Sequence, residues 1–131
     1  MSGFINLRKT SVTFLIKTGL THRQRNAVIA IADYTEAIRV NPNYAEAHNK
    51  LGIIRARNLK DYPAAKADFD RAIEINPNYG DAYYNRARVR EFLEDEDGAI
   101  ADYHKAAELY EKDGNTNDYQ DAIKHLQMLQ E

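Results

Sequence analysis

The residues that could bind a metal ion or move a proton are four histidines and one short acidic run. No two histidines have the spacing of a helical zinc motif. The acidic run, residues 94–98, lacks the alternating oxygen ligands and the final glutamate of an EF-hand calcium loop. The chain has no cysteine, so thiolate ligands and cysteine nucleophiles are also excluded. We therefore expect no metal site in this chain.

Catalysis and nucleotide binding are not indicated either. The chain contains no glycine-rich phosphate loop, no Gly-x-Gly-x-x-Gly and no Gly-x-Ser-x-Gly. His48 is expected as a packed or half-buried ring, and His104 is expected to face solvent. The acidic run fits a solvated turn at the start of a helix, where negative charge is favourable. We expect no cofactor and no catalytic residue, which makes an enzyme the least favoured class.

The composition is that of one water-soluble globular domain. The chain has 131 residues, of which 44% are hydrophobic and 29% are charged. No apolar stretch is long enough to span a membrane. Residues 1–32 hold five basic residues and no acidic one, whereas residues 33–131 are acidic overall. The acidic part argues against nucleic-acid binding there.

An internal repeat organises most of the chain. Residues 41–44, Asn-Pro-Asn-Tyr, return as residues 76–79, which is 35 positions later. Residues 30–34, Ala-Ile-Ala-Asp-Tyr, return as residues 99–103, and a related copy occupies residues 65–69. Repeats of this length are typical of solenoid proteins, in which each unit packs on its neighbours.

Each copy reads as one helix followed by a tight turn and another helix. Ala30, Tyr34, Ala37 and Ile38 recur at helical spacing, with polar residues between them. The small alanines allow neighbouring helices to approach closely. The Asn-Pro pair ends the helix, because proline disfavours helical backbone in the residue before it. Asn43 is then expected to cap the next helix.

These spacings resemble the tetratricopeptide repeat family, whose pattern is Trp-x2-Leu-Gly-x2-Tyr, then Ala-x3-Phe, then Pro. The matching residues are His48, Leu51, Gly52, Ala65, Phe69 and Pro77 in one repeat, and Tyr83, Arg86, Ala87, Ala99 and Tyr103 in the next. His48 replaces the large aromatic residue and Arg86 replaces the leucine, which should weaken single packing contacts without changing the fold. The style of the repeats looks like that of bacterial members, cyanobacterial ones especially.

The resemblance implies an all-α fold, a right-handed superhelical solenoid of helix-turn-helix repeats. The repeats occupy residues 27–113: the second helix of repeat one at 27–41, repeat two at 44–78 and repeat three at 79–113. Residues 114–131 are expected to form a capping helix, because a solenoid needs a terminal element with a polar outer face. Asn117 or Asp118 would cap that helix at its start.

Residues 1–26 form a basic, moderately apolar segment with three open interpretations. The first is a degenerate first helix packed on residues 27–40. The second is an organelle transit peptide, since such peptides are basic, serine-rich and poor in acid. The third is an arm that binds an anionic surface or another copy of the chain.

The resemblance also implies that the first helix of each repeat lines a concave surface. The candidate lining residues combine charges, amides and one tyrosine: Glu46, Asn49, Lys50, Ile53, Arg57, Asp81, Tyr84, Asn85, Arg88 and Glu91. Such a surface suits an extended peptide, because amides bond its backbone and Tyr84 supplies contact area. Arg88 or Lys50 would meet a carboxylate.

One ligand class of the family can be tested on the sequence. Family members that grip the C-terminal carboxylate of heat-shock chaperones use lysines, asparagines and an arginine from successive first helices. Asn85 matches an asparagine position, but Asn49 and Ile53 stand where a lysine and an asparagine are needed. Asp81 is acidic where another lysine is needed. We therefore do not expect the chaperone clamp.

The sequence thus predicts a non-catalytic, cytoplasmic protein-interaction module. Its groove would bind a peptide segment or a partner helix of another protein, without nucleic acid and without a membrane span. The alternative is a structural scaffold that self-associates through the N-terminal end, which keeps a homo-oligomer open.

Overall fold

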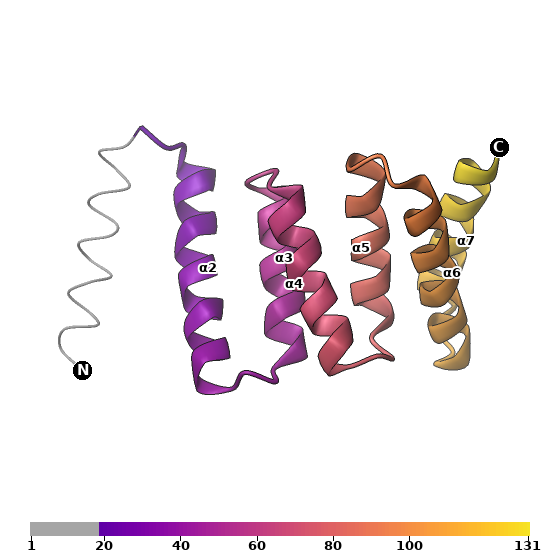
Figure 1. Cartoon of the computed structure of the whole chain (residues 1–131), viewed down its shortest axis with the longest axis horizontal. Helices are drawn as coiled ribbons and strands as arrows, with labels where there is room; N and C mark the ends of the chain where they lie inside the picture. The colour runs from indigo at the N-terminus through magenta and orange to yellow at the C-terminus, as the bar shows by residue number, and fades with distance from the viewer. Residues whose placement is uncertain (1–18) are drawn as a thin grey trace.

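The structure, a computed structural model, describes residues 19–131, which form a stack of α-helices without any strand, with α3 and α4 overlapping in the view of Figure 1, as do α6 and α7. Each helix packs on the next one along the chain, and α3 also contacts α5. The helices are α2 (His22–Val40), α3 (Ala45–Arg57), α4 (Tyr62–Ile75), α5 (Gly80–Phe92), α6 (Glu96–Lys112) and α7 (Thr116–Gln130). The predicted all-α helical solenoid is confirmed. Within residues 19–131, no helix combines the length and the apolar character that crossing a bilayer requires.

The start of α2 differs from the prediction. The helix begins at His22 instead of residue 27, because Thr21 and Gln24 form a capping box. The Gln24 backbone N–H donates to Thr21 Oγ1 at 3.2 Å, and the Thr21 backbone N–H donates to Gln24 Oε1 at 3.0 Å. The helix therefore extends into the segment 1–26, and residues 1–18 of that segment lie outside the described residues.

The Asn-Pro-Asn-Tyr turns explain why the predicted asparagine caps are wrong. Asn41 Oδ1 accepts a hydrogen bond from the Asn43 backbone N–H at 3.3 Å, which folds the turn before the helix begins. Tyr44 then occupies the N-cap position of α3 without a side-chain cap. The copy at residues 76–79 has the same turn. Likewise Asn115, and not a later residue, caps α7 by accepting from the Asp118 N–H at 3.3 Å.

Small residues let the helices approach closely. Ala65, Ala72, Ala99 and Ala106 are fully buried between helices. A Cβ atom added to Gly52 would lie 2.5 Å from the Phe69 ring, a distance that real side chains do not show. The α3–α4 contact therefore requires glycine at this position, which agrees with the repeat pattern.

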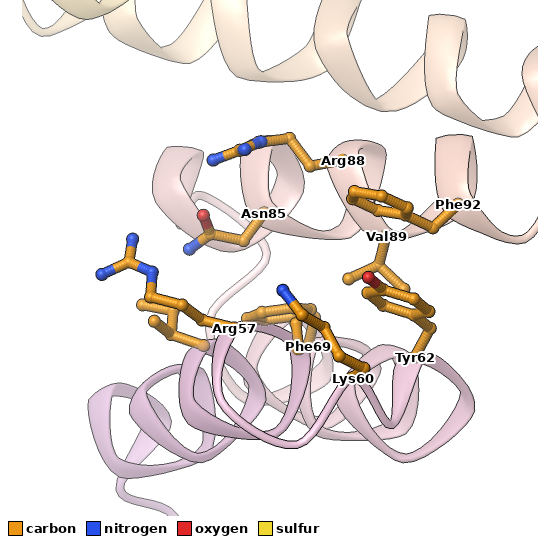
Figure 2. A pocket seen from close by; sticks show the side chains of 10 residues that line it. Arg57, Lys60, Tyr62, Phe69, Asn85, Arg88, Val89 and Phe92 are labelled. Carbon is orange, nitrogen blue, oxygen red and sulfur yellow. The ribbon is translucent and has the colours of Figure 1, made fainter. Parts of the chain in front are cut away.

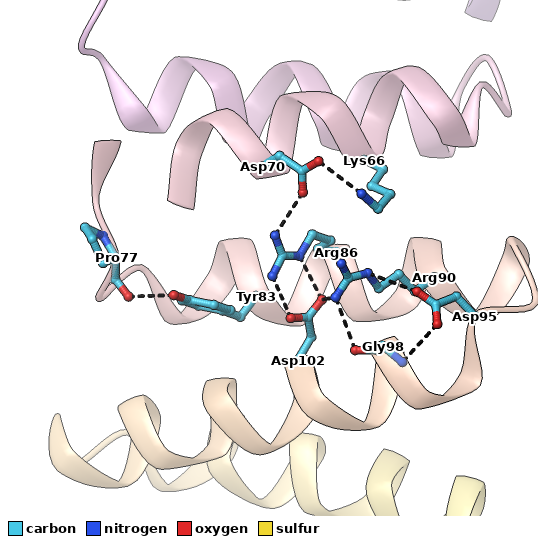
Figure 3. Close-up of polar contacts among 9 residues, drawn as sticks. All are labelled: Lys66, Asp70, Pro77, Tyr83, Arg86, Arg90, Asp95, Gly98 and Asp102. Carbon is cyan, nitrogen blue, oxygen red and sulfur yellow. Dashed lines mark hydrogen bonds and ion pairs between the residues drawn. The ribbon is translucent and has the colours of Figure 1, made fainter. Parts of the chain in front are cut away.

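An ion-pair seam, formed by Arg86, Arg90, Asp70 and Asp102, joins α4, α5 and α6 (Figure 3). Arg86 donates to both oxygens of Asp102 at 2.8 Å and to Asp70 Oδ1 at 2.9 Å. Arg90 Nη1 donates to Asp102 Oδ2 at 2.8 Å. The Asp102 carboxylate is 4% exposed, so the two guanidinium groups supply the partners that a buried charge requires.

The seam corrects the expectation that Arg86 only weakens packing. Its side chain links two repeats through hydrogen bonds that a leucine cannot make. The hydrogen bonds to Asp102 and then to Asp70 hold the pKa of Arg86 above its ordinary value, although burial opposes this. In the preceding repeat, Arg55 Nη1 lies 2.7 Å from both oxygens of Asp68, so an arginine–aspartate pair recurs.

Candidate binding groove

Two adjoining hollows lie along α3 and α5, and both are lined by Ile53 and Asn85. The first, of about 140 Å³, is the basic cup: Ile53, Ala56, Arg57, Lys60, Tyr62, Phe69, Asn85, Arg88, Val89 and Phe92. The second, of about 320 Å³, is the acidic end: Glu46, Asn49, Lys50, Ile53, Tyr79, Asp81, Tyr84, Asn85, Tyr110, Asp118 and Asp121. The two hollows adjoin at Ile53 and Asn85, and together they are called the groove.

An aromatic pair forms one wall of the basic cup (Figure 2). The rings of Tyr62 and Phe92 stack with their centroids 4.5 Å apart and their planes 3° from parallel. Phe92 is nevertheless 61% exposed, while Phe69 and Val89 beneath are buried. An exposed phenyl ring held rigidly by a stacked neighbour offers apolar contact area at low entropic cost, which is typical of binding surfaces.

Three cations line the same hollow as that aromatic pair (Figure 2). Arg57, Lys60 and Arg88 are exposed and make no hydrogen bond or ion pair with any residue in the range 19–131. Lys60 sits in the turn between α3 and α4 with a φ of 57°, which is the left-handed region. The cup therefore combines an apolar wall with unpaired positive charge.

The acidic end has the opposite charge. Its carboxylates are Glu46, Asp81, Asp118 and Asp121, and Lys50 is the single cation of its lining. Tyr110 donates a hydrogen bond to Asp81 Oδ1 at 2.5 Å. Burial and this bond raise the pKa of Tyr110, so the phenol stays neutral and keeps its proton on the hydrogen bond. This hydrogen bond therefore holds the Asp81 side chain in place.

The amides between the hollows are tied to one another. Asn85 Nδ2 donates to Asn49 Oδ1 at 3.2 Å, and Asn49 Nδ2 donates to the Tyr79 hydroxyl at 3.3 Å. Asn49 is only 3% exposed, so it belongs to the floor of the groove and not to its surface. Of the two amides, only Asn85 remains accessible enough to meet a ligand backbone.

The structure brings the predicted lining residues together, with one exception. Those that line the hollows are Glu46, Asn49, Lys50, Ile53, Arg57, Asp81, Tyr84, Asn85 and Arg88. Glu91 lines neither hollow, because it turns toward α6 and accepts a hydrogen bond from the Tyr103 hydroxyl. Its placement in the groove is corrected for that reason.

Tyr84 is more firmly packed than a free contact residue. Its hydroxyl donates to Asp121 on α7, and its ring meets those of Tyr103 and His125 edge to face. Burial and the Asp121 carboxylate raise its pKa. Replacing Tyr84 by alanine would therefore disturb the α5–α6–α7 packing as well as the groove.

Sequence reasoning missed Phe92, Lys60, Asp118 and Asp121. Phe92 lies 35 positions after Arg57, so the repeat offset alone could have indicated it. The two aspartates were missed because α7 was treated only as a cap. Lys60 has no such signal, since it lies in a turn outside the repeated helices.

Comparison with sequence families gives three overlapping matches. Profiles described as TPR repeat and tetratricopeptide repeat match residues 30–58, 45–79 and 69–124. A comparison with curated protein sequences found no match. The helices α2 to α7 thus coincide with the repeat matches along most of the described chain.

Solved structures with the same fold share little sequence. The first TPR of Spaghetti (RPAP3), bound to an HSP90 peptide, is 23% identical with a TM-score of 0.70, covering 95% of this chain and 88% of that one. The TPR2B domain of yeast Sti1, in a complex with pHsp70, is 19% identical with a TM-score of 0.75, covering 95% and 94%. PcrH, in complex with the chaperone binding region of PopD, is 15% identical with a TM-score of 0.72, covering 99% and 93%.

Proposed function

Because matches along residues 30–124 support the tetratricopeptide repeat family for this chain, we propose that it is a non-catalytic protein-interaction module. Its groove along α3, α5 and α7 binds a peptide segment or a partner helix of another protein. Two structural neighbours support this use of the fold, since one is named as bound to an HSP90 peptide and the other as in complex with the chaperone binding region of PopD. The groove residues are those of the basic cup and the acidic end.

The observation that carries this proposal is the basic cup. Arg57 and Arg88 stay unpaired in the same hollow as the exposed Phe92, whereas Arg55, Arg86 and Arg90 pair with aspartates. Aromatic and arginine side chains in a concave site are the residue types that dominate binding energy at interfaces. For so small a groove, we expect affinities in the micromolar range, because ordering a flexible peptide offsets much of the contact energy.

The test is a selection from a random-peptide display library with the full chain as bait. Wild type should enrich peptides that the double variant Arg88→Glu/Phe92→Ser does not retain. Arg71→Glu is the control of equal charge change, since Arg71 lines neither hollow and pairs only with Glu74 on the surface of α4. Circular dichroism must show the same helix content in all three proteins. Enrichment of the same peptides by the double variant would remove the groove from the proposal.

The alternative, self-association through the N-terminal end, has two supporting observations. Val40 is 71% exposed at the end of α2, and Ala27 is the single buried residue of that helix. Sedimentation velocity of the full chain over a concentration series tests this alternative. A dimer that Val40→Ser weakens would favour the scaffold, whereas a monomer at all concentrations would contradict it.

We also propose the division of the chain and its setting. Residues 44–78 and 79–113 each form one repeat, and residues 114–131 act as a cap, a role supported by Ala122 and Leu126 of α7, which are buried in clusters with α6 residues. The style of residues 30–34 supports a bacterial, cyanobacterial-like chain of the cytoplasm. Cell fractionation with an antibody against the chain tests the compartment.

A further inference from the structure

The groove changes sign along its length, which restricts the peptides that it can accept. Arg57, Lys60 and Arg88 surround one hollow, and the adjoining hollow carries four carboxylates with one lysine. Since Ile53 and Asn85 line both, a ligand that occupies the whole groove meets both charges. This inference rests on the proposed function and specifies the chemistry of its partner.

The basic cup fits one kind of side-chain pattern. The Tyr62–Phe92 stack and the Ile53 side chain provide an apolar contact for a large aromatic or aliphatic group. The unpaired Arg57 and Arg88 lie beside it, and guanidinium groups bind carboxylates through paired hydrogen bonds. An apolar residue with acidic neighbours satisfies the wall and the cations together.

We propose that the groove binds a charge-ordered peptide segment. A large apolar side chain flanked by aspartate or glutamate occupies the basic cup, and neutral or basic residues of the same segment lie over the acidic end. The order follows from charge complementarity, because carboxylates over Glu46, Asp81 and Asp121 would be repelled. The contact is with side chains inside a segment, so it does not need a free C-terminus.

The same charge pattern disfavours a polyanion as the occupant. Nucleic acid carries phosphates at regular spacing, and those that extend past the basic cup would lie against the acidic end. A second copy of the chain could offer residues 92–97 to the basic cup, because Phe92 and Leu93 are followed by acidic residues. We consider it the less suitable occupant. Residues 92–97 border the basic cup itself, since Phe92 is part of its wall.

The direct test measures fluorescence anisotropy with three labelled peptides whose ends are blocked. Each has a central phenylalanine: Asp-Glu-Phe-Glu-Asp, Asn-Gln-Phe-Gln-Asn or Lys-Arg-Phe-Arg-Lys, extended by Gly-Ser linkers. The acidic peptide should bind the full-length wild type at least about tenfold more tightly than the other two. Its affinity should fall with added sodium chloride, because the cations are exposed to solvent.

Variants locate the contact. Arg88→Glu and Phe92→Ser should each weaken the acidic peptide by about tenfold, whereas the charge-matched Arg71→Glu should leave it unchanged. Asp81→Asn should tighten the binding of the acidic peptide, because that change removes negative charge from the adjoining hollow. Equal binding of all three peptides, or an Arg88→Glu variant that binds as well as wild type, would overturn the inference.

The selection from the peptide library distinguishes a failure of this inference from a failure of the proposed function. Groove-dependent peptides that lack acidic residues beside an apolar one would overturn the charge order and leave the proposed function standing. No groove-dependent peptide of any composition would contradict both. If the acidic peptide binds only by displacing a dimer, detected by sedimentation of the mixture, the occupant of the basic cup is a second copy and the inference is wrong.

Discussion

Arg86 and Arg90 lie on the side of α5 that meets α4 and α6, whereas Arg88, between them in the sequence, lies on the groove side. The first two share the buried carboxylate of Asp102, and the third has no charged partner in the described chain. One helix thus carries arginines with two roles. Arg86 and Arg90 stabilise the fold, whereas Arg88 is unpaired and can contact a ligand. The difference teaches that pairing, and not residue type, identifies a binding arginine here.

The largest expected effect is the loss of stability when the ion-pair seam around Arg86 and Arg90 is disrupted. Asp102→Ala leaves Arg86 and Arg90 partly buried without the carboxylate that they share. We expect the free energy of unfolding to fall by about 3–5 kcal/mol, because removing one partner of a buried pair leaves the desolvation cost of the other uncompensated. Urea denaturation followed by circular dichroism measures this change. A loss below about 1 kcal/mol would mean that the seam is not a stabilising element.

A smaller effect is expected from the geometry of the seam. Arg86→Lys keeps the charge but loses the paired hydrogen bonds to Asp102 and the bond to Asp70. We expect a loss of about 1–2 kcal/mol in unfolding free energy by the same measurement. Arg86→Leu, which restores the family residue, is the companion variant. If it matches wild type, packing at this position contributes as much as the ion pairs.

The pH dependence separates two aspartates on α4. Burial raises the pKa of Asp70, but its hydrogen bonds with Arg86 and Lys66 outweigh this and hold the pKa below its ordinary value. Its contribution to stability is therefore present above the ordinary aspartate range and is lost as the pH falls through that range and below. Asp70→Asn should reduce the stability that is lost on acidification, measured as the free energy of unfolding. The reduction should be under about 1 kcal/mol, because the carboxylate is partly exposed.

Asp68 is the control for that measurement. Burial raises its pKa despite the hydrogen bond from Arg55, so protonation at falling pH favours the folded state. Asp68→Asn should consequently leave the acid loss in place or steepen it. Equal flattening by both variants would contradict the assignment of the acid loss to Asp70.

The smallest effect on stability is expected on the groove side. Arg88→Ala removes a side chain without a charged partner, so the unfolding free energy should change by less than about 0.5 kcal/mol. Peptide affinity should fall all the same. Paired urea and anisotropy measurements on one protein sample test both. A stability loss comparable to that of Asp102→Ala would remove the distinction between the two sides of α5.

The repeat spacing was enough to predict the succession of helices. The family resemblance supplied the candidate lining residues, and nine of them border the two hollows. The repeat spacing could not distinguish Arg86 from Arg88, since their roles depend on Asp70 and Asp102 from other helices. Glu91 was misplaced for a similar reason, as the Tyr103 hydroxyl draws it toward α6. Local turn chemistry was the other source of error: Asn41 accepts from the Asn43 N–H before α3 starts.

Packing between consecutive helices, with α3 and α5 in the only additional contact of note among the described helices, keeps most contacts close in sequence. Chains with such local contacts fold quickly and lose structure piecewise from their ends. Fraying of α2, which buries one residue, costs few contacts beyond α3. The α3–α5 junction lies between the outer helices, so we expect it to stay assembled when those helices open. A ligand bound at this junction would stabilise the contact between α3 and α5. The terminal helices would still be able to unfold locally.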